Sequence, residues 1–276
     1  MLWSGFQTLE ANALSEAPIT METDYAIEME GLTRRFGDFV AVDKVTLKIP
    51  KGQLYGFLGL NGAGKTTTIR MLTTLLPPSA GTAKLWGHDV TKEPLAVRKL
   101  VGLVSDETSE SQSAWTAREY LSYFARIRHM PNPDEEVERI LDDVGLDAKF
   151  RGKLIRTYST GMKRRVEIAR ALMGRPKVLF LDEPTRGLDL PAKRDMWSLL
   201  RRLAATENVT TFLSSHDAQE IRSLCSEISV IARGRLVHTG ATREMGGDID
   251  AFEERLIGML TQSERIEPPG SHFRAE

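Results

Sequence analysis

The segment 59–66 reads G-L-N-G-A-G-K-T and matches the phosphate-binding pattern G-x-x-x-x-G-K-[ST] at every position. Its glycines allow a tight turn in which successive backbone N–H groups point toward one anion. Lys65 adds a cation for the β- and γ-phosphates, and the hydroxyl of Thr66 suits Mg²⁺. A buried-strand pattern precedes the segment and a helical pattern follows it, so the positive end of a helix would face the anion. We therefore predict a nucleotide site formed by Gly59, Asn61, Gly62, Ala63, Gly64, Lys65, Thr66 and Thr67.

A second segment, V-L-F-L-D-E-P at 178–184, ends an apolar strand with two adjacent carboxylates. Ligands of open α/β sheets bind at the carboxyl ends of the strands, where Asp182 would lie. We expect Asp182 to hold Mg²⁺, mostly through water, and Glu183 to be the general base for a hydrolytic water. Two acids after a strand also occur as helix caps, but together with the phosphate loop they indicate a P-loop NTPase.

Further segments resemble the motifs of ABC-type ATPases. Y-S-T-G-M at 158–162 resembles their signature, usually L-S-G-G-Q, with Thr160 for the first glycine and Met162 for glutamine. The other matches are P-T-R-G-L-D-L (184–190) to the D-loop, L-S-S-H-D-A-Q-E-I (213–221) to the switch-histidine segment, and T-R-R-F-G-D-F-V-A-V-D-K-V (33–45) to the adenine-stacking segment. Order and spacing fit over 26–240. The chain is thus identified as a member of the ABC transporter ATP-binding subunits, with a signature similar to that of drug, polysaccharide and lipid exporters.

This resemblance implies a homodimer or pseudo-dimer, arranged head to tail, with two ATP molecules at the interface. Ser159 and Gly161 would contact the nucleotide held by the partner chain, because a helix start offers a hydroxyl, a bare backbone and a positive dipole end to an anion. Asp189 would couple the two sites across the interface. A simpler role for Ser159 is that of helix N-cap, and both roles can hold together.

The resemblance also assigns roles to His216 and Phe36. His216 would contact the γ-phosphate and position the attacking water with Glu183, so that the catalytic residues would be Lys65, Glu183 and His216. Phe36 would stack on adenine. The alternatives are a buried core histidine at 216 and an ordinary packed aromatic at 36.

The polar stretch S-D-E-T-S-E-S-Q-S at 105–113 follows the strand pattern V-G-L-V. In ABC ATPases the loop at this place carries a glutamine that reaches Mg²⁺ and joins the core to a helical subdomain. Aligned on the strand, that position falls on Asp106, or on Glu107 after a small shift, whereas Gln112 lies too far along. We expect Asp106 or Glu107 to take the metal-side role. The alternative is a loop that only couples motion.

The elements that must position these residues alternate between strand and helix, which predicts an α/β fold with a mainly parallel sheet and helices on both faces. The resemblance implies a RecA-like P-loop core, an antiparallel β subdomain and an all-helical insertion specific to ABC ATPases. We divide the chain into a poorly ordered extension (1–24), an ATPase domain (25–240) and a C-terminal tail (241–276) with one amphipathic stretch at 250–262. Within the ATPase domain the core is 25–105 and 174–240, and the helical subdomain is 106–173.

The composition limits the kinds of partner that we expect. The 276 residues include 37 Lys+Arg and 38 Asp+Glu, so no global positive field favours nucleic acid. The basic run K-R-R-V-E-I-A-R at 163–170 is expected to place its charges on the exposed face of an amphipathic helix. The single cysteine, Cys225, fits a reducing compartment. No apolar run approaches the ~18 residues of a membrane span. We expect a peripheral protein on the cytoplasmic side of the membrane, bound to separate permease subunits.

Two other functions remain open. One is a soluble, non-transport ABC ATPase, although ribosome-acting forms usually carry two cassettes and chromosome-type forms carry long coiled coils that are missing here. The other is a P-loop kinase or GTPase. A kinase would not need the signature, and the chain has no N-K-x-D segment for reading guanine.

Overall fold

The computed structural model describes residues 24–105, 114–206 and 209–264. Its larger sheet has six strands in the order β10-β9-β3-β8-β7-β6. These strands are β3 (Leu54–Leu58), β6 (Val101–Val104), β7 (Val178–Asp182), β8 (Thr210–Ser215), β9 (Glu227–Ala232) and β10 (Arg235–Ala241). All neighbours pair in parallel except β9 and β10, which are antiparallel. The apolar runs seen in the sequence lie in the centre of this sheet, as expected for strands covered on both faces.

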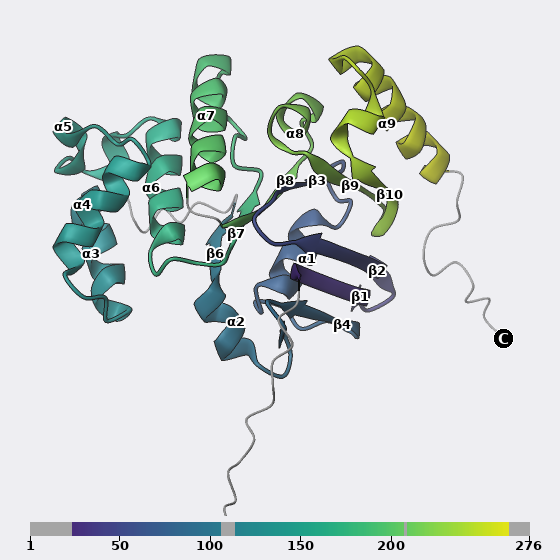
Figure 1. The fold of residues 1–276 in the computed structure, drawn as a ribbon, viewed down its shortest axis with the longest axis horizontal. Helices are drawn as coiled ribbons and strands as arrows, with labels where there is room; N and C mark the ends of the chain where they lie inside the picture. Colours follow the sequence, from purple (N-terminus) through teal and green to yellow (C-terminus); the bar gives the residue numbers. More distant parts are fainter. Residues whose placement is uncertain (1–23, 106–113, 207–208, 265–276) are drawn as a thin grey trace, which may run out of the picture.

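A second, antiparallel sheet has the order β2-β1-β4-β5. Its strands are β1 (Tyr25–Phe36), β2 (Phe39–Pro50), β4 (Ala80–Leu85) and β5 (His88–Asp89). Strands β1 and β2 form a hairpin in which Phe36 faces Phe39 across the turn. This sheet lies beside α1 (Lys65–Leu72) at the purple end of the chain in Figure 1.

The helices fall into groups along the chain. They are α2 (Pro94–Leu100), α3 (Ala117–Ile127), α4 (Pro133–Asp143), α5 (Ala148–Arg151), α6 (Thr160–Leu172), α7 (Leu190–Thr206), α8 (Ala218–Leu224) and α9 (Ile249–Glu264), with 3₁₀ turns η2 (Ile155–Thr157) and η3 (Thr242–Met245). Helices α3 to α6 gather at one side of the molecule, and α7, α8 and α9 follow along the same face of the sheet (Figure 1). In the described part of the chain, no helix is long and apolar enough to cross a membrane.

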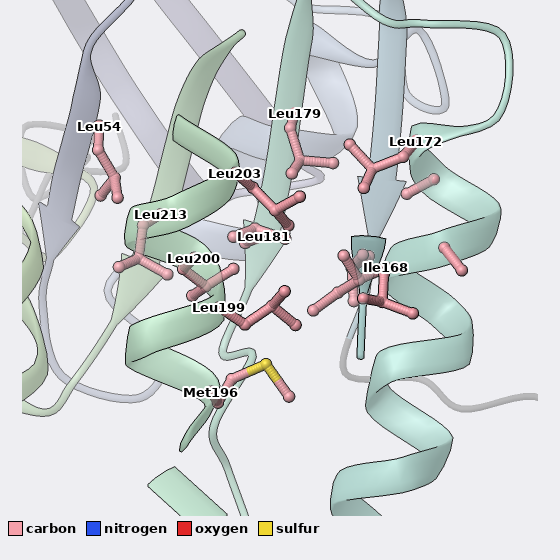
Figure 2. Close-up of a cluster of buried hydrophobic side chains, with 14 of the residues drawn as sticks. Leu54, Ile168, Leu172, Leu179, Leu181, Met196, Leu199, Leu200, Leu203 and Leu213 are labelled. Carbon is pink, nitrogen blue, oxygen red and sulfur yellow. The ribbon is translucent and has the colours of Figure 1, made fainter. Parts of the chain in front are cut away.

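The core has two layers because successive strand residues point to opposite faces of the sheet. On β7, Leu179 and Leu181 belong to the cluster beneath the helices, whereas Val178 and Phe180 belong to the cluster shared with α1 and the antiparallel sheet. Figure 2 shows the first cluster, where leucines of α7 pack beside β7 with side chains of α6 alongside. The labelled members are Leu54, Ile168, Leu172, Leu179, Leu181, Met196, Leu199, Leu200, Leu203 and Leu213.

The fold class predicted from the sequence is confirmed, but some local expectations are not. The helical pattern that follows the phosphate loop extends over 65–76, up to Pro77 and Pro78, and so predicts a helix of that length, whereas α1 ends at Leu72. Thr74 has a φ of 61°, and the N–H groups of both Leu75 and Leu76 donate to the carbonyl of Arg70. This left-handed turn ends the helix before the prolines do.

The charges of 163–170 do not all lie on an exposed face. Val166 and Ile168 are buried as expected, but Arg164 and Glu167 are also buried, at 5% and 6% exposure. The two side chains form an ion pair of 2.9 Å, and the Arg164 guanidinium donates to the carbonyl of Ser105. Helical periodicity could not reveal this, because the end of β6 covers the charged side of α6.

The segment after β10 packs onto the core. Residues 242–264, which the sequence grouped with a polar tail, form η3 and α9. Phe252 and Leu256 are the buried apolar residues of α9 and join the cluster beneath the helices. Residues 265–276 lie outside the described residues.

Candidate active site

The loop between β3 and α1 is held in place by backbone contacts. The N–H of Gly59 donates to the carbonyl of Ser215 at the end of β8, at 3.1 Å. Gly64 has a φ of 107°, and a Cβ there would lie 2.6 Å from the carbonyl oxygen of Ala41 on β2, so only glycine fits. Gly62 has a φ of 78°, but a Cβ there would meet no atom within 4 Å, because that side of the loop is open. No side-chain hydrogen bond caps α1. The backbone N–H groups of its first turn can therefore donate to another acceptor.

Lys65, the first residue of α1, is 5% exposed and folds back over the loop. Its ammonium donates to the carbonyl of Gly59 at 2.7 Å and to that of Leu60 at 3.2 Å. It also lies 3.0 Å from Oε1 of Glu183 at the end of β7. The charge is therefore directed to the place where the loop and β7 meet.

Thr66 and Asp182 come together from different elements. The Thr66 hydroxyl donates to Oδ2 of Asp182 at 2.7 Å, and the hydroxyl of Ser214 on β8 donates to Oδ1. Asp182 is 2% exposed. Its orientation is thus fixed by one hydroxyl from α1 and one from β8, and the sequence did not single out Ser214.

Glu183 and His216 are adjacent in space. Nδ1 of His216 lies 2.6 Å from Oε2 of Glu183, and the His216 side chain is 44% exposed. His216 is therefore not the core histidine that the sequence left as an alternative. Glu183 has a φ of 50°, which is uncommon for a non-glycine residue, and its N–H donates to the carbonyl of Ser214 at 3.1 Å.

A buried network behind these two residues was missed at the sequence level. Glu220 on α8 is 1% exposed and accepts hydrogen bonds from the hydroxyls of Ser215 and Thr185 and from the indole of Trp197. Burial raises the pKa of Glu220 above its ordinary value, although the hydroxyls of Ser215 and Thr185 act in the opposite direction. The only signal in the sequence was an acid four residues after His216, which reads as a helix-cap pattern.

Ser159 and Gly161 lie apart from the phosphate loop. Helix α6 stands on the helical side of the molecule and α1 on the other side of β7 (Figure 1). Ser159 caps α6 by accepting a hydrogen bond from the N–H of Met162 at 3.3 Å, so the capping role holds. A Cβ at Gly161 would lie 3.9 Å from both Leu188 and Ala192, which places the signature next to the segment that carries Asp189.

Asp189 caps the start of α7. Its carboxylate accepts a hydrogen bond from the N–H of Ala192 at 2.9 Å. Asp189 is exposed. Asp189, Ser159 and Gly161 therefore form one group, and Lys65, Thr66, Asp182, Glu183 and His216 form another.

Phe36 lies at the tip of the β1–β2 hairpin and is 47% exposed. The guanidinium of Arg34 sits 4.6 Å from its ring centroid. The same hairpin passes the phosphate loop at Ala41, the residue that excludes a Cβ at Gly64. An exposed ring on this hairpin is not the packed core aromatic of the alternative interpretation. Asp106, Glu107 and Gln112 lie outside the described residues.

The donor set fits Mg²⁺ and a nucleotide. Thr66 and Asp182 offer one hydroxyl and one carboxylate, the hard oxygens that Mg²⁺ prefers, and Mg²⁺ usually takes only one or two protein ligands beside phosphates and water. Among the described residues, no cluster of three or more His, Cys, Asp or Glu side chains could hold a metal alone. The uncapped helix start and the open side of Gly62 fit a phosphate chain.

Comparison with known proteins decides the family. The profile of the family described as "ABC transporter" matches residues 42–186. The chain belongs to the ABC transporter family. This ABC chain is an ATPase with a nucleotide-binding cassette, as its signature, D-loop and switch-histidine segments predicted.

Curated relatives and solved structures agree. The chain is 39% identical over 233 residues to the daunorubicin/doxorubicin resistance ATP-binding protein DrrA of Streptomyces peucetius, covering 84% of this chain and 70% of that protein. It is 38% identical to the bacitracin transport ATP-binding protein BcrA of Bacillus licheniformis, covering 76% of this chain and 68% of the relative. Its fold superposes on cbiO1 of Clostridium perfringens, part of the ABC transporter complex cbiONQ, with a TM-score of 0.75 and 26% identity over 88% of this chain and 96% of that one.

Proposed function

We propose that this ABC ATPase is the ATP-hydrolysing subunit of an exporter and that it acts on a separate membrane permease from the cytoplasmic side. The proposal rests on one observation. Lys65 and His216 both contact Glu183, next to the paired Thr66 and Asp182. The export direction rests on the similarity to a drug-resistance and an antibiotic-transport subunit.

Each side chain has a role in this proposal. The loop from Gly59 to Thr67 holds the phosphates, and Lys65 exchanges the Glu183 carboxylate for a terminal phosphate oxygen. Thr66 and Asp182 hold Mg²⁺, which when bound with ATP neutralises charge on the phosphates. Glu183 accepts the proton of the attacking water, and His216 orients that carboxylate from 2.6 Å. Phe36 stacks on the adenine ring.

We propose that hydrolysis needs two copies, or this chain and a similar one. Within one chain, Ser159, Gly161 and Asp189 belong to the group at the starts of α6 and α7, whereas Lys65 and Glu183 belong to the group around the phosphate loop. Head-to-tail pairing places the first group of one chain against the nucleotide held by the other. Nucleotide binding then favours the closed pair, and hydrolysis releases it, which is the differential affinity that a conformational motor requires.

We place the permease contact on α3. Trp115, just before α3, and Tyr123 and Ile127 on α3 are 39%, 50% and 55% exposed, although they are large apolar side chains. They line a groove of about 630 Å³ together with Arg118, Glu119, Ser122 and Arg126. The rings of Trp115 and Tyr123 pack against each other at 5.5 Å between centroids. Exposed aromatic pairs with polar rims are typical anchors for a partner helix.

Co-purification tests the function. The full chain is isolated from detergent-solubilised membranes of its own cells, and bound proteins are identified by mass spectrometry. We expect a multi-span membrane protein with the wild type and with Leu95→Asp, a control at a side chain that is 71% exposed on α2. Tyr123→Asp should lower its recovery about tenfold or more, because burying a carboxylate in an apolar contact is costly.

Thermal unfolding of each variant shows whether the chain remains folded. Recovery of ribosomal proteins or DNA without any membrane protein would instead support the soluble, non-transport ABC ATPase. Equal recovery with Tyr123→Asp and Leu95→Asp would keep the transporter but remove the contact from α3.

A further inference from the structure

Glu220 joins the two segments that bear Glu183 and His216. Its Oε1 accepts hydrogen bonds from Thr185 Oγ1 at 2.8 Å and from Trp197 Nε1 at 3.3 Å. Its Oε2 accepts one from Ser215 Oγ at 2.6 Å. All three donors are buried, so the carboxylate is fully enclosed by its partners.

The positions of these donors are specific. Thr185 follows Glu183 by two residues, and Ser215 directly precedes His216. The backbone of Ser215 also accepts from Gly59 of the phosphate loop, at 3.1 Å. Beyond the β7–β8 ladder, which ends at Asp182 and Ser214, the Glu220 carboxylate therefore ties together the segments that carry the catalytic pair.

An acidic residue at position 220, three residues after Asp217, would usually be explained as part of a helix cap. Asp217-x-x-Glu220 resembles a capping box at the start of α8, in which the glutamate would bind the backbone N–H of Asp217. Only half of that box forms. The Asp217 carboxylate accepts from the N–H of Glu220 at 3.0 Å, but the N–H of Asp217 donates to Ser215 Oγ instead. The Glu220 carboxylate is thus directed to Thr185, Ser215 and Trp197 rather than to the cap.

The opposite side of the His216 loop is held by α7. Lys193 forms an ion pair of 2.8 Å with Asp217, and the N–H of Lys193 donates to the carbonyl of Asp189 at 2.9 Å. The loop that carries His216 is therefore anchored to α8 by Glu220 and to α7 by Lys193. These contacts hold Ser215 and Asp217, the residues directly before and after His216.

We propose that Glu220 is a positioning residue for ATP hydrolysis: it clamps the segment after Glu183 to the segment before His216 and thereby keeps this pair in contact. The inference rests on the roles proposed above for Glu183 and His216. Glu220 acts through them and touches no reacting atom. Because buried networks of this kind act as a unit, removal of the carboxylate should affect turnover more than nucleotide binding.

Steady-state hydrolysis by the full chain tests the clamp. We compare Glu220→Ala, His216→Ala and the double variant, with Tyr55→Phe as the control. Tyr55 loses a buried 2.7 Å hydrogen bond to Ser229 that joins β3 and β9 but touches neither catalytic segment. Glu220→Ala should lower kcat about 10- to 100-fold, as expected for a displaced catalytic pair, and change KM less than about twofold.

The double variant supplies the decisive comparison. If Glu220 acts through His216, then Glu220→Ala in the His216→Ala background should lower kcat by less than about a further twofold. Glu220→Gln should recover most of the loss, because its amide oxygen accepts from Thr185 and Trp197 and its NH₂ group donates to the Ser215 hydroxyl. Tyr55→Phe should retain the wild-type kcat.

Other results overturn the clamp. If Glu220→Ala lowered kcat by the same factor in the wild-type and His216→Ala backgrounds, Glu220 and His216 would act independently. A matching loss of kcat in Tyr55→Phe would show that the loss of any buried hydrogen bond destabilises the protein. A wild-type kcat in His216→Ala would remove the proposed role of His216 and the clamp with it, whereas additive losses would remove the clamp alone.

Discussion

The backbone of Glu183 is held in an unfavourable conformation. A φ of 50° costs a non-glycine residue about 1–3 kcal/mol and persists only where the surroundings impose it. Here the N–H of Glu183 donates to Ser214, while its two carboxylate oxygens face Lys65 and His216. The direction of the carboxylate is therefore set by the fold, which suits a base that must meet a water in one place.

Glu183→Gln should separate binding from hydrolysis. The amide keeps the shape of the side chain but accepts protons poorly, so kcat should fall at least ~100-fold, the usual contribution of a positioned base. ATP affinity should stay within about threefold, and sedimentation with saturating ATP should show a stable dimer. Hydrolysis at the wild-type rate would contradict the assignment of Glu183 as base.

Sequence reasoning reached the residues whose chemistry is carried by local spacing. Lys65 and Thr66 follow from one loop pattern, and Asp182 follows from a strand that ends in acids. Glu220 could not be found in this way, because its partners Thr185 and Trp197 are brought to it only by the packing of α7 and α8. A local helix-cap pattern hid a tertiary role.

Helix α6 shows the same limit at the scale of elements. Its apolar period was predicted, but a buried ion pair cannot be inferred from periodicity. Arg164 and Glu167 are both at most 6% exposed, and the Arg164 guanidinium also reaches the carbonyl of Ser105 at 3.0 Å. The helix that starts at the signature is thus tied to the strand end that leads into residues 106–113. The amphipathic stretch noted at 250–262 lies in α9, but its pattern did not reveal that this segment docks on the core.

A double-mutant cycle should reveal the coupling between Arg164 and Glu167. Arg164→Met should lower the free energy of unfolding by about 3–5 kcal/mol, because Glu167 then loses its buried partner. The pair Arg164→Met with Glu167→Leu should recover much of that loss, since neither charge of this ion pair is then left without the other. Urea unfolding measures both. Additive losses would show that the two residues stabilise the chain independently.

On the scale of the whole molecule, the site residues of each chain fall into two groups, which we propose are the two halves of a composite site. The phosphate loop and Glu183 lie at the ends of β3 and β7, whereas Ser159 and Gly161 lie with Asp189 at the start of α6 and α7. The parallel sheet could be predicted from alternating strands and helices, and its strand order places Lys65 near Glu183. The relation between two chains is a property of the assembly, so it must be tested on mixtures.

Mixing two inactive variants should restore hydrolysis if the halves meet across the dimer. Lys65→Ala removes phosphate binding but keeps the signature, and Ser159→Arg blocks the signature but keeps the phosphate loop. An equal mixture forms mixed dimers in about half of the pairs, and each mixed dimer has one complete site, so activity should reach roughly a quarter of the wild-type value. As the control, Lys65→Ala mixed with Glu183→Gln should stay inactive, because both changes damage the phosphate-loop half and no complete site can form. Activity that never exceeds the mean of the separate variants would show that Ser159 does not serve the nucleotide of the partner chain.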